Sequence, residues 1–260
     1  MPDAEALLTG HGVAKSYGPV HALRDVDFQL MPSEIVGLAG DNGAGKSTLM
    51  KIVAGSTTPS AGEVSLNGRE ISTFDPGSAR AHGIEMVYQD LALCENLDAR
   101  ENIFLGREPR RRRFGLRMIA AEQMTHGTDA LLERLEIAIG SAFEPVSQLS
   151  GGQRQAVAIC RALAFKPQLI LMDEPTAALS VNAVAPLLRL IRRLPAEGAA
   201  VILVSHRLSD LLDVTDRIYV LRNGEVVADL VTAETDEEEL LRLMAGLPRN
   251  GQRPRRNGAE

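Results

Sequence analysis

Aromatic side chains are scarce in this chain of 260 residues, which has no tryptophan, three tyrosines and six phenylalanines. Cysteine is also rare. Its two copies, Cys94 and Cys160, lie far apart and have no histidine or cysteine neighbour at the spacing of metal ligands. We therefore expect both thiols to be reduced, buried and structural.

Long apolar runs are missing as well. No stretch of about 18 apolar residues occurs, and the amino terminus lacks the basic and apolar regions of a signal peptide. We expect a cytosolic chain that works at a membrane only by docking onto a separate membrane-spanning partner. The formal charge of -6 argues against a broad basic face for nucleic acid, so no nucleic-acid partner is expected.

Three short apolar runs, at 34–39, 169–172 and 201–204, show no alternation of apolar and polar residues. Such runs are typical of central strands in a sheet that is covered by helices on both faces. Each run is followed by glycine or polar residues, at the edge where open parallel sheets bind their ligands. The sequence therefore predicts an α/β fold in which the three strand ends converge on one site.

Two Asn-Gly pairs, Asn67-Gly68 and Asn223-Gly224, lie between apolar-rich flanks and predict β-hairpins. Together with the alternating segment 26–30 they indicate an antiparallel subdomain beside the parallel core. Beyond residue 246 the chain is rich in proline, glycine, asparagine and arginine. We predict a folded domain at 1–246 and a disordered tail at 247–260.

Between about residues 99 and 148 strand signals vanish and helical signals dominate. They are clearest at 129–137, and we expect Leu131, Leu132, Leu135 and Ala138 to form one apolar face. A helical subdomain of about residues 99–165 inserted in the core is therefore predicted. We interpret the basic run at 110–113 as a solvated charged loop, with lipid headgroups or an acidic loop of a partner as alternatives.

The segment from Gly40 to Ser47 fits the pattern G-x-x-x-x-G-K-[ST], follows a predicted strand and opens a helix that runs to about Ala54. Its glycines allow backbone N–H groups to turn inward around phosphates, and the helix amino terminus adds the positive end of its dipole. Lys46 is predicted to reach the β- and γ-phosphates, and Ser47 to offer a hydroxyl to Mg²⁺. A turn that only links strand to helix is the plainer alternative. The predicted nucleotide-binding residues are Gly40, Asp41, Asn42, Gly43, Ala44, Gly45, Lys46, Ser47 and Thr48.

The apolar strand at 169–172 ends in two carboxylates, Asp173 and Glu174. In phosphoryl-transfer sites this arrangement allows the first carboxylate to hold Mg²⁺ while the second faces the γ-phosphate. Glu174 is therefore the candidate catalytic base. A solvated acid at a strand end is the alternative.

The segment Leu149-Ser150-Gly151-Gly152-Gln153 precedes a helix and lies roughly 20 residues before the Asp-Glu strand. Ser150 can cap that helix, and the two glycines allow backbone N–H groups to approach an anion closely. Together with the upstream phosphate loop, this segment resembles the signature of ABC ATPases. The resemblance to that family covers about residues 8–244. The resemblance implies a phosphate-loop core with a parallel sheet, an antiparallel β subdomain and an inserted helical subdomain. It also implies that the chain binds and hydrolyses ATP with Mg²⁺, and that Ser150, Gly151, Gly152 and Gln153 contact nucleotide.

Three further positions take their expected roles from the resemblance. Tyr17 stands where the family stacks an aromatic ring on adenine. Gln89 matches the glutamine that senses Mg²⁺ and the membrane partner, and His206 matches the histidine that contacts the γ-phosphate. An exposed tyrosine and a structural or solvated histidine are the plainer interpretations. Ser180 departs from the pattern, because the family often places aspartate there.

The run from Glu174 to Ser180 and the segment 83–106 are similar to ATPases of bacterial sugar importers of the ribose, galactose, xylose and fructose group. Many of those carry two nucleotide units, and this chain resembles the single-unit, fructose-type members. The resemblance implies a homodimer of ATPase subunits on polytopic permease subunits, with a periplasmic sugar-binding protein as an indirect partner. The implied location is the cytoplasmic face of the inner membrane.

Apolar residues at 90–106, namely Leu91, Leu93, Leu97, Ile103 and Phe104, are expected either to anchor the membrane partner or to form subdomain core. Two other functions stay open. One is an ABC ATPase for a different small solute or for export. The other is a soluble ABC ATPase that acts on DNA or the ribosome, although such proteins carry long coiled coils or two nucleotide units that are missing here.

Overall fold

The computed structural model describes residues 5–71, 74–113 and 116–248. The predicted tail therefore lies almost entirely outside the described residues. The tail also carries a basic run at 253–256, for which a solvated charged segment is expected as at 110–113, and this run lies outside the described residues too.

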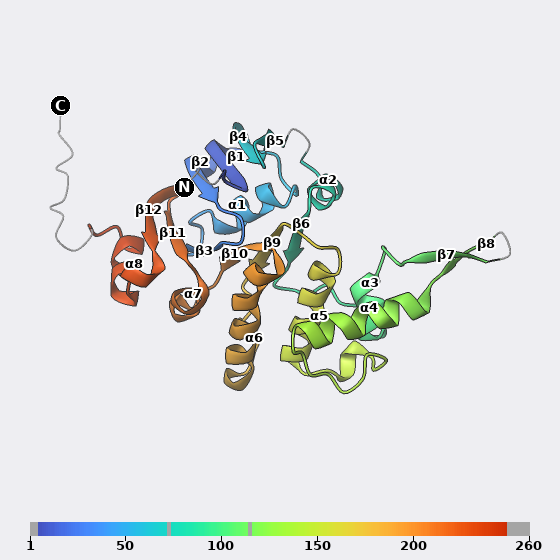
Figure 1. Ribbon diagram of the computed structural model, residues 1–260. Coiled ribbons are helices and arrows are strands. Elements are labelled where there is room, and N and C mark those ends of the chain that lie inside the picture. The colour runs from blue at the N-terminus through green and yellow to red at the C-terminus, as the bar shows by residue number, and fades with distance from the viewer. Residues whose placement is uncertain (1–4, 72–73, 114–115, 249–260) are drawn as a thin grey trace, which may run out of the picture.

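A six-stranded sheet forms the core, and its strand order is β12-β11-β3-β10-β9-β6 (Figure 1). The three predicted central strands pair in parallel at its centre, with Val201 opposite Ile35 and Ile170 opposite Val201. Alternate residues of these strands enter two different hydrophobic clusters, one on each face of the sheet. Burial on both faces explains why the runs are apolar without alternation. The strands are β3 (Ile35–Ala39), β6 (Ile84–Val87), β9 (Leu169–Asp173), β10 (Ala200–Val204), β11 (Arg217–Arg222) and β12 (Glu225–Val231).

A four-stranded antiparallel sheet, of order β2-β1-β4-β5, lies beside the core. The hairpin predicted at Asn67-Gly68 belongs to this sheet, and both turn residues have positive φ, at 51° and 69°, as a two-residue hairpin turn requires. The strands are β1 (Leu8–Tyr17), β2 (Val20–Leu30), β4 (Ala61–Leu66) and β5 (Arg69–Glu70). The predicted antiparallel subdomain is therefore present, but it contains only one of the two predicted hairpins.

The second hairpin, at Asn223-Gly224, belongs to the core sheet, so its assignment to the antiparallel subdomain was wrong. β11 pairs in parallel with β3, and β12 continues the sheet as an antiparallel edge strand. Four consecutive residues of β11, from Ile218 to Leu221, are buried. A strand that is buried on both faces belongs inside a layered sheet, whereas the turn alone only specifies a hairpin.

Helices pack on both faces of the core. Alternate residues of the central strands face α1 and the antiparallel sheet on one side, and the other residues face α5, α6 and α7. The helices of the core are α1 (Lys46–Val53), α2 (Pro76–Ala81), α6 (Val181–Arg193), α7 (Leu208–Val214) and α8 (Glu237–Met244), with short 3-10 turns at η2 (Leu194–Glu197) and η3 (Thr232–Glu234).

Between β6 and β9 the chain leaves the sheet and forms α3 (Ala99–Phe104), α4 (Ala121–Arg134), η1 (Val146–Gln148) and α5 (Gly151–Leu163). α4 begins earlier than the periodicity indicated and ends at Arg134. Leu131, Leu132 and Leu135 are buried as expected. Ala138 is exposed and lies beyond the helix, so its place on the apolar face was wrong.

The inserted segment also contains a two-stranded hairpin, β7 (Arg110–Arg113) and β8 (Leu116–Ile119). The expectation of a strand-free insertion and of a loop at 110–113 was therefore wrong. The described side chains of these strands are exposed. Without a buried face the strands have no apolar alternation, and periodicity could not reveal them.

Asn102 fixes the segment that enters α3. It is fully buried, and its Oδ1 accepts from the Cys94 N–H at 2.7 Å. Its Nδ2 lies 2.9 to 3.2 Å from the carbonyl oxygens of Cys94, Leu97 and Asp98. One amide side chain therefore satisfies several backbone groups in the stretch that links β6 to the helical insertion.

Replacing Asn102 with alanine leaves these buried backbone groups without their partner. We expect Asn102→Ala to lower the free energy of unfolding by about 2 kcal/mol in urea titrations. The exposed Asn96 offers a matched control, and Asn96→Ala should change stability by less than about 0.5 kcal/mol. Equal losses in both variants would contradict the assigned role of Asn102.

Candidate nucleotide site

The carboxyl ends of β3, β10 and β9 are neighbours, so the loops that follow these strands meet at one edge of the core sheet. The loop after β3 is the predicted phosphate loop. The loop after β9 begins at Glu174, and the loop after β10 carries His206. Glu174 N–H donates to the Val204 carbonyl at 2.9 Å. This bond links the start of the loop that carries Glu174 to the end of the strand before His206.

The phosphate loop has a backbone that only glycine fits at two positions. Gly40 has φ 152°, and an added Cβ would lie 2.4 Å from the Leu221 carbonyl oxygen. Gly45 has φ 109°, and a Cβ there would lie 2.7 Å from the Ala22 carbonyl oxygen. Side chains at either position would clash with neighbouring strands, so the pattern of glycines is required by the close packing of the loop.

Lys46 is buried at the start of α1. Its Nζ donates to the Gly40 carbonyl at 2.5 Å and to the Asp41 carbonyl at 3.0 Å. Burial lowers the pKa of Lys46, and the negative charges of Glu174, Asp41 and Asp173 oppose that shift. A cation held between backbone carbonyls and beside carboxylates is well placed for an anionic ligand that offers stronger acceptors.

The carboxylates at the end of β9 have different surroundings. Burial raises the pKa of Asp173, with a further contribution from the negative charge of Glu174, while Lys46 opposes the shift. The side chain of Glu174 is 13% exposed, and its Oε1 lies 2.5 Å from His206 Nε2. Glu174 also has φ 51°, a left-handed conformation that is costly for a residue with a side chain. The fold thus holds Glu174 and His206 together at the strand edge.

A buried acid that the sequence reasoning did not find connects these two loops. Asp210 Oδ2 accepts from Thr176 Oγ1 at 2.7 Å and from Ser205 Oγ at 3.4 Å. All three residues are buried. Thr176 follows Glu174 and Ser205 precedes His206, so Asp210 links the chain segments on which both side chains are carried. An acidic residue shortly after Ser-His was the available signal, but nothing in the sequence pairs it with Thr176.

Tyr17 belongs to the antiparallel sheet, whereas Gln89 follows a strand of the core sheet. Tyr17 ends β1, is 49% exposed, and has Lys15 Nζ at 5.2 Å from its ring centroid. The paired strand β2 passes directly beside Gly45. Gln89 follows β6, is exposed, and lines a cavity of about 260 Å³ together with Glu174 and Gly151.

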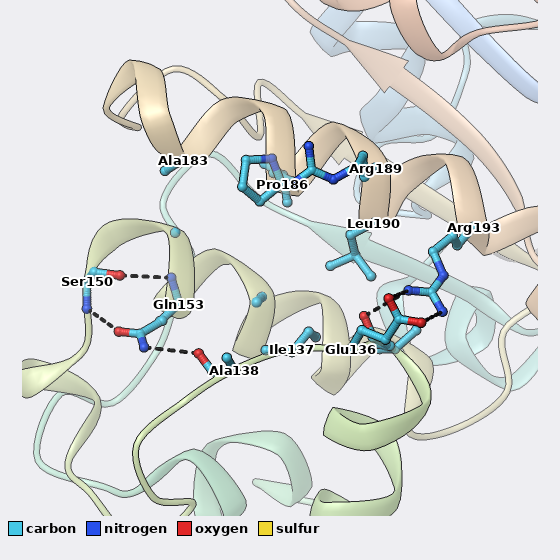
Figure 2. Close-up of a pocket in the computed structure, with 14 residues that line it drawn as sticks. Glu136, Ile137, Ala138, Ser150, Gln153, Ala183, Pro186, Arg189, Leu190 and Arg193 are labelled. Atoms are coloured by element: carbon cyan, nitrogen blue, oxygen red, sulfur yellow. Dashed lines mark hydrogen bonds and ion pairs between the residues drawn. The ribbon is translucent and has the colours of Figure 1, made fainter.

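Most of the Ser-Gly-Gly segment lies at another cavity. Ser150, Gly152 and Gln153 line a space of about 770 Å³ between α5 and α6 (Figure 2). The predicted cap is confirmed: Ser150 Oγ accepts from the Gln153 N–H at 3.3 Å, and Gln153 Oε1 accepts from the Ser150 N–H at 2.9 Å. Gln153 Nε2 also donates to the Ala138 carbonyl at 3.1 Å. This cavity is not lined by Lys46, Asp173 or Glu174.

The donor set suits a hard cation. Ser47 presents an exposed hydroxyl, and Asp173 and Gln89 offer oxygen atoms, the ligands that Mg²⁺ prefers. In the described ranges no group of three or more histidine, cysteine, aspartate or glutamate side chains forms a cage for a metal. Such a sparse set fits an ion that also takes oxygens from phosphate and water.

Comparison with known proteins agrees with this geometry. A family model described as ABC transporter matches residues 23–177. The xylose/arabinose import ATP-binding protein of Sulfolobus acidocaldarius is 42% identical over 238 residues, which cover 92% of this chain and 93% of that protein. The ribose import ATP-binding protein of Chromobacterium violaceum is 42% identical over 97% of this chain, but only 49% of its own length is covered. The chain thus spans about half the length of the ribose-import relatives it matches.

A solved structure supports the same assignment. A dimeric ATP-binding cassette in a post-hydrolysis state, bound to ADP and Pi, is 30% identical with a TM-score of 0.72. The match covers 86% of this chain and 98% of that one. The chain therefore belongs to the ABC transporter family, and its α/β fold and ATPase class are confirmed.

The link through Asp210 can be tested by stability. Asp210→Ala leaves the buried hydroxyls of Thr176 and Ser205 without their shared acceptor, and we expect it to lower the free energy of unfolding by about 2 kcal/mol in urea melts. Asp129 is exposed on α4, and Asp129→Ala should stay within about 0.5 kcal/mol of the wild type. A double-mutant cycle with Thr176→Val should show coupling of about 1 kcal/mol, whereas additive effects would contradict a direct link.

Proposed function

We propose that this ATPase is the energising subunit of an importer that takes up a sugar, namely a monosaccharide. Two observations support the proposal. The phosphate loop, Glu174 and His206 meet at one sheet edge. The relatives that match most of the chain are named for import of xylose/arabinose and ribose. Import of another small solute and export are the main alternatives.

In the proposed mechanism the loop from Gly40 to Thr48 binds the phosphates of ATP through its backbone N–H groups and through Lys46. Tyr17, on the hairpin beside the loop, offers its ring to adenine. Ser47, Gln89 and Asp173 would hold Mg²⁺, whose positive charge neutralises charge that develops on the phosphates. Lys46 stabilises the same charge from the loop, where its amine already faces two backbone oxygens.

Glu174 acts as the general base in this scheme. It accepts a proton from a water molecule that attacks the γ-phosphorus in line, and the bond from that phosphorus to the bridging oxygen breaks. His206, 2.5 Å from Glu174 Oε1, holds the carboxylate in position and contacts the γ-phosphate. Because Glu174 is largely buried, few water molecules compete for its proton-accepting oxygen.

We further propose that two copies of the chain complete each site. Gly151 and Gly152 begin α5, where the first N–H groups of a helix lack acceptors within the helix. Together with the helix dipole they suit a phosphate, yet most of this segment lines a cavity apart from the phosphate loop. A second copy would bring its Ser150, Gly151, Gly152 and Gln153 to the ATP held by the first. The dimeric form of the similar cassette supports this arrangement.

We propose that the chain docks, at the cytoplasmic face of the inner membrane, onto a pair of polytopic permease subunits, with a periplasmic sugar-binding protein on the far side. No helix within the described ranges is long and apolar enough to cross a bilayer. Of the apolar residues at 90–106, Ile103 is fully buried and belongs to the core. Leu105 and the preceding Tyr88, at 43% and 42% exposure, are better placed to contact a permease.

The role of Glu174 gives a direct prediction. Glu174→Gln removes the base but keeps the shape of the side chain, so we expect ATP affinity to stay within about threefold and turnover to fall by a factor of about 100 or more. ATP should then trap a dimer that light scattering detects. Lys46→Ala is the contrasting variant, because it should lose nucleotide binding itself. Hydrolysis by Glu174→Gln at the wild-type rate would contradict the assignment.

The transport role requires a test in the native host. After deletion of the gene, uptake of labelled xylose, arabinose and ribose is measured with plasmids that carry the wild type or Glu174→Gln. We expect uptake of at least one of these sugars to be lost and to return only with the wild type. Unchanged uptake of all three sugars would contradict the proposed substrate class. Recovery of ribosomes or DNA with the purified chain, in place of permease subunits, would contradict the importer.

A further inference from the structure

The hairpin of β7 and β8 projects from the helical insertion beyond α3 and α4 (Figure 1). Its segment 110–119 contains five arginines and no acidic residue. In a chain whose formal charge is -6, this hairpin is a local concentration of positive charge. Its described side chains are all exposed.

The hairpin also exposes large apolar side chains. Leu116 is 67% exposed, Met118 46% and Ile119 55%. None of the three belongs to either hydrophobic cluster of the protein. They therefore contribute little to the stability of the fold, and several exposed large apolar side chains in one short segment are a candidate interaction surface.

The pairing of the strands places like charges opposite each other. Arg112 pairs directly with Arg117 in the antiparallel register, and such a pair destabilises a hairpin by repulsion. One hairpin arginine already has a carboxylate partner, because Arg111 Nη1 lies 3.3 Å from Glu122 Oε2. Within the described residues, neither Arg112 nor Arg117 forms such an ion pair, unlike Arg107 with Glu85 at 2.7 Å and Arg217 with Glu34 at 3.1 Å. An anionic group that lies between Arg112 and Arg117 would relieve their repulsion.

Basic and apolar side chains alternate around this ribbon. Residues that are directly opposite share a face, so Arg110 lies with Ile119, and Arg111 lies with Met118. Both faces therefore combine guanidinium groups with apolar groups. Phosphate headgroups accept hydrogen bonds from arginine, and the boundary below them accommodates apolar side chains. Nucleic acid would match the arginines but would leave the apolar side chains in water.

We propose that the β7–β8 hairpin binds the anionic surface of a lipid bilayer. The contact adds to the proposed docking on a permease, because it brings the helical insertion to the membrane through lipid alone. It does not depend on the identity of the transported solute. The binding is electrostatic in its larger part, so it weakens as salt rises.

The experiment uses the purified full chain without a permease. Flotation is measured with vesicles of phosphatidylcholine alone and of an equal mixture with phosphatidylglycerol, at low and high salt. We expect the protein to float only with the anionic vesicles and to be released by salt. Arg112→Ala/Arg117→Ala should reduce the partition coefficient roughly 30-fold, at about fivefold for each arginine near the surface.

The matched control is Arg69→Ala/Arg189→Ala, which removes the same charge from two exposed arginines outside the hairpin. It should bind the vesicles as the wild type does. Leu116→Ser/Met118→Ser should weaken binding at low salt and lower the salt concentration at which the protein is released, because it removes the apolar contribution. ATP binding checks that each variant is folded.

The proposal is overturned if the wild type does not float with anionic vesicles, or if the control loses binding as much as the hairpin variant. It is also overturned if the hairpin variant floats normally but no longer copurifies with permease subunits, because the hairpin is then a protein contact. None of these results bears on hydrolysis by Glu174. The import function would therefore stand if the lipid contact failed.

Discussion

The buried amine of Lys46 is the interaction on which the candidate site depends. It joins the first turn of α1 to the carbonyl groups of Gly40 and Asp41, and so closes the phosphate loop on itself. The two glycine positions allow this closure because the loop runs against β2 and β11 without room for side chains. Burial disfavours the charge of Lys46 and nearby carboxylates favour it. Their balance keeps a cation where an anion must bind.

The second half of the site depends on the first through the parallel sheet. β10 lies between β3 and β9, so the loop with His206 lies between the phosphate loop and Glu174. Asp210 then connects the segments after β9 and β10, because it accepts hydrogen bonds from the hydroxyl groups of Thr176 and Ser205. A left-handed backbone at Glu174 persists because both neighbouring segments are fixed. The local strain is thus carried by a network of buried hydrogen bonds.

Much of the fold could be predicted from the sequence because its signals are local. The central strands follow from apolar runs, and the phosphate loop from residues whose chemistry and spacing allow few other structures. The sheet that receives a hairpin is not local information, which is why Asn223-Gly224 was placed in the wrong subdomain. Asp210 was missed for the same reason, since its partner Thr176 is 34 residues away. The roles of Tyr17, Gln89 and His206 stay predictions, although the structure brings His206 to Glu174.

The hairpin of β7 and β8 could not be predicted for a different reason, which is that its strands have no buried face. A strand that contributes nothing to a core leaves no burial pattern, so its presence has to be explained by what its surface contacts. The rest of the insertion is tied inward: Arg193 pairs with Glu136, and Arg134 pairs with Glu197. Arg110, Arg112 and Arg117 instead point their charge away from the protein core. Ion pairs between the insertion and the core therefore set the position of the insertion, whereas the exposed arginines of the hairpin are available to a partner outside the chain.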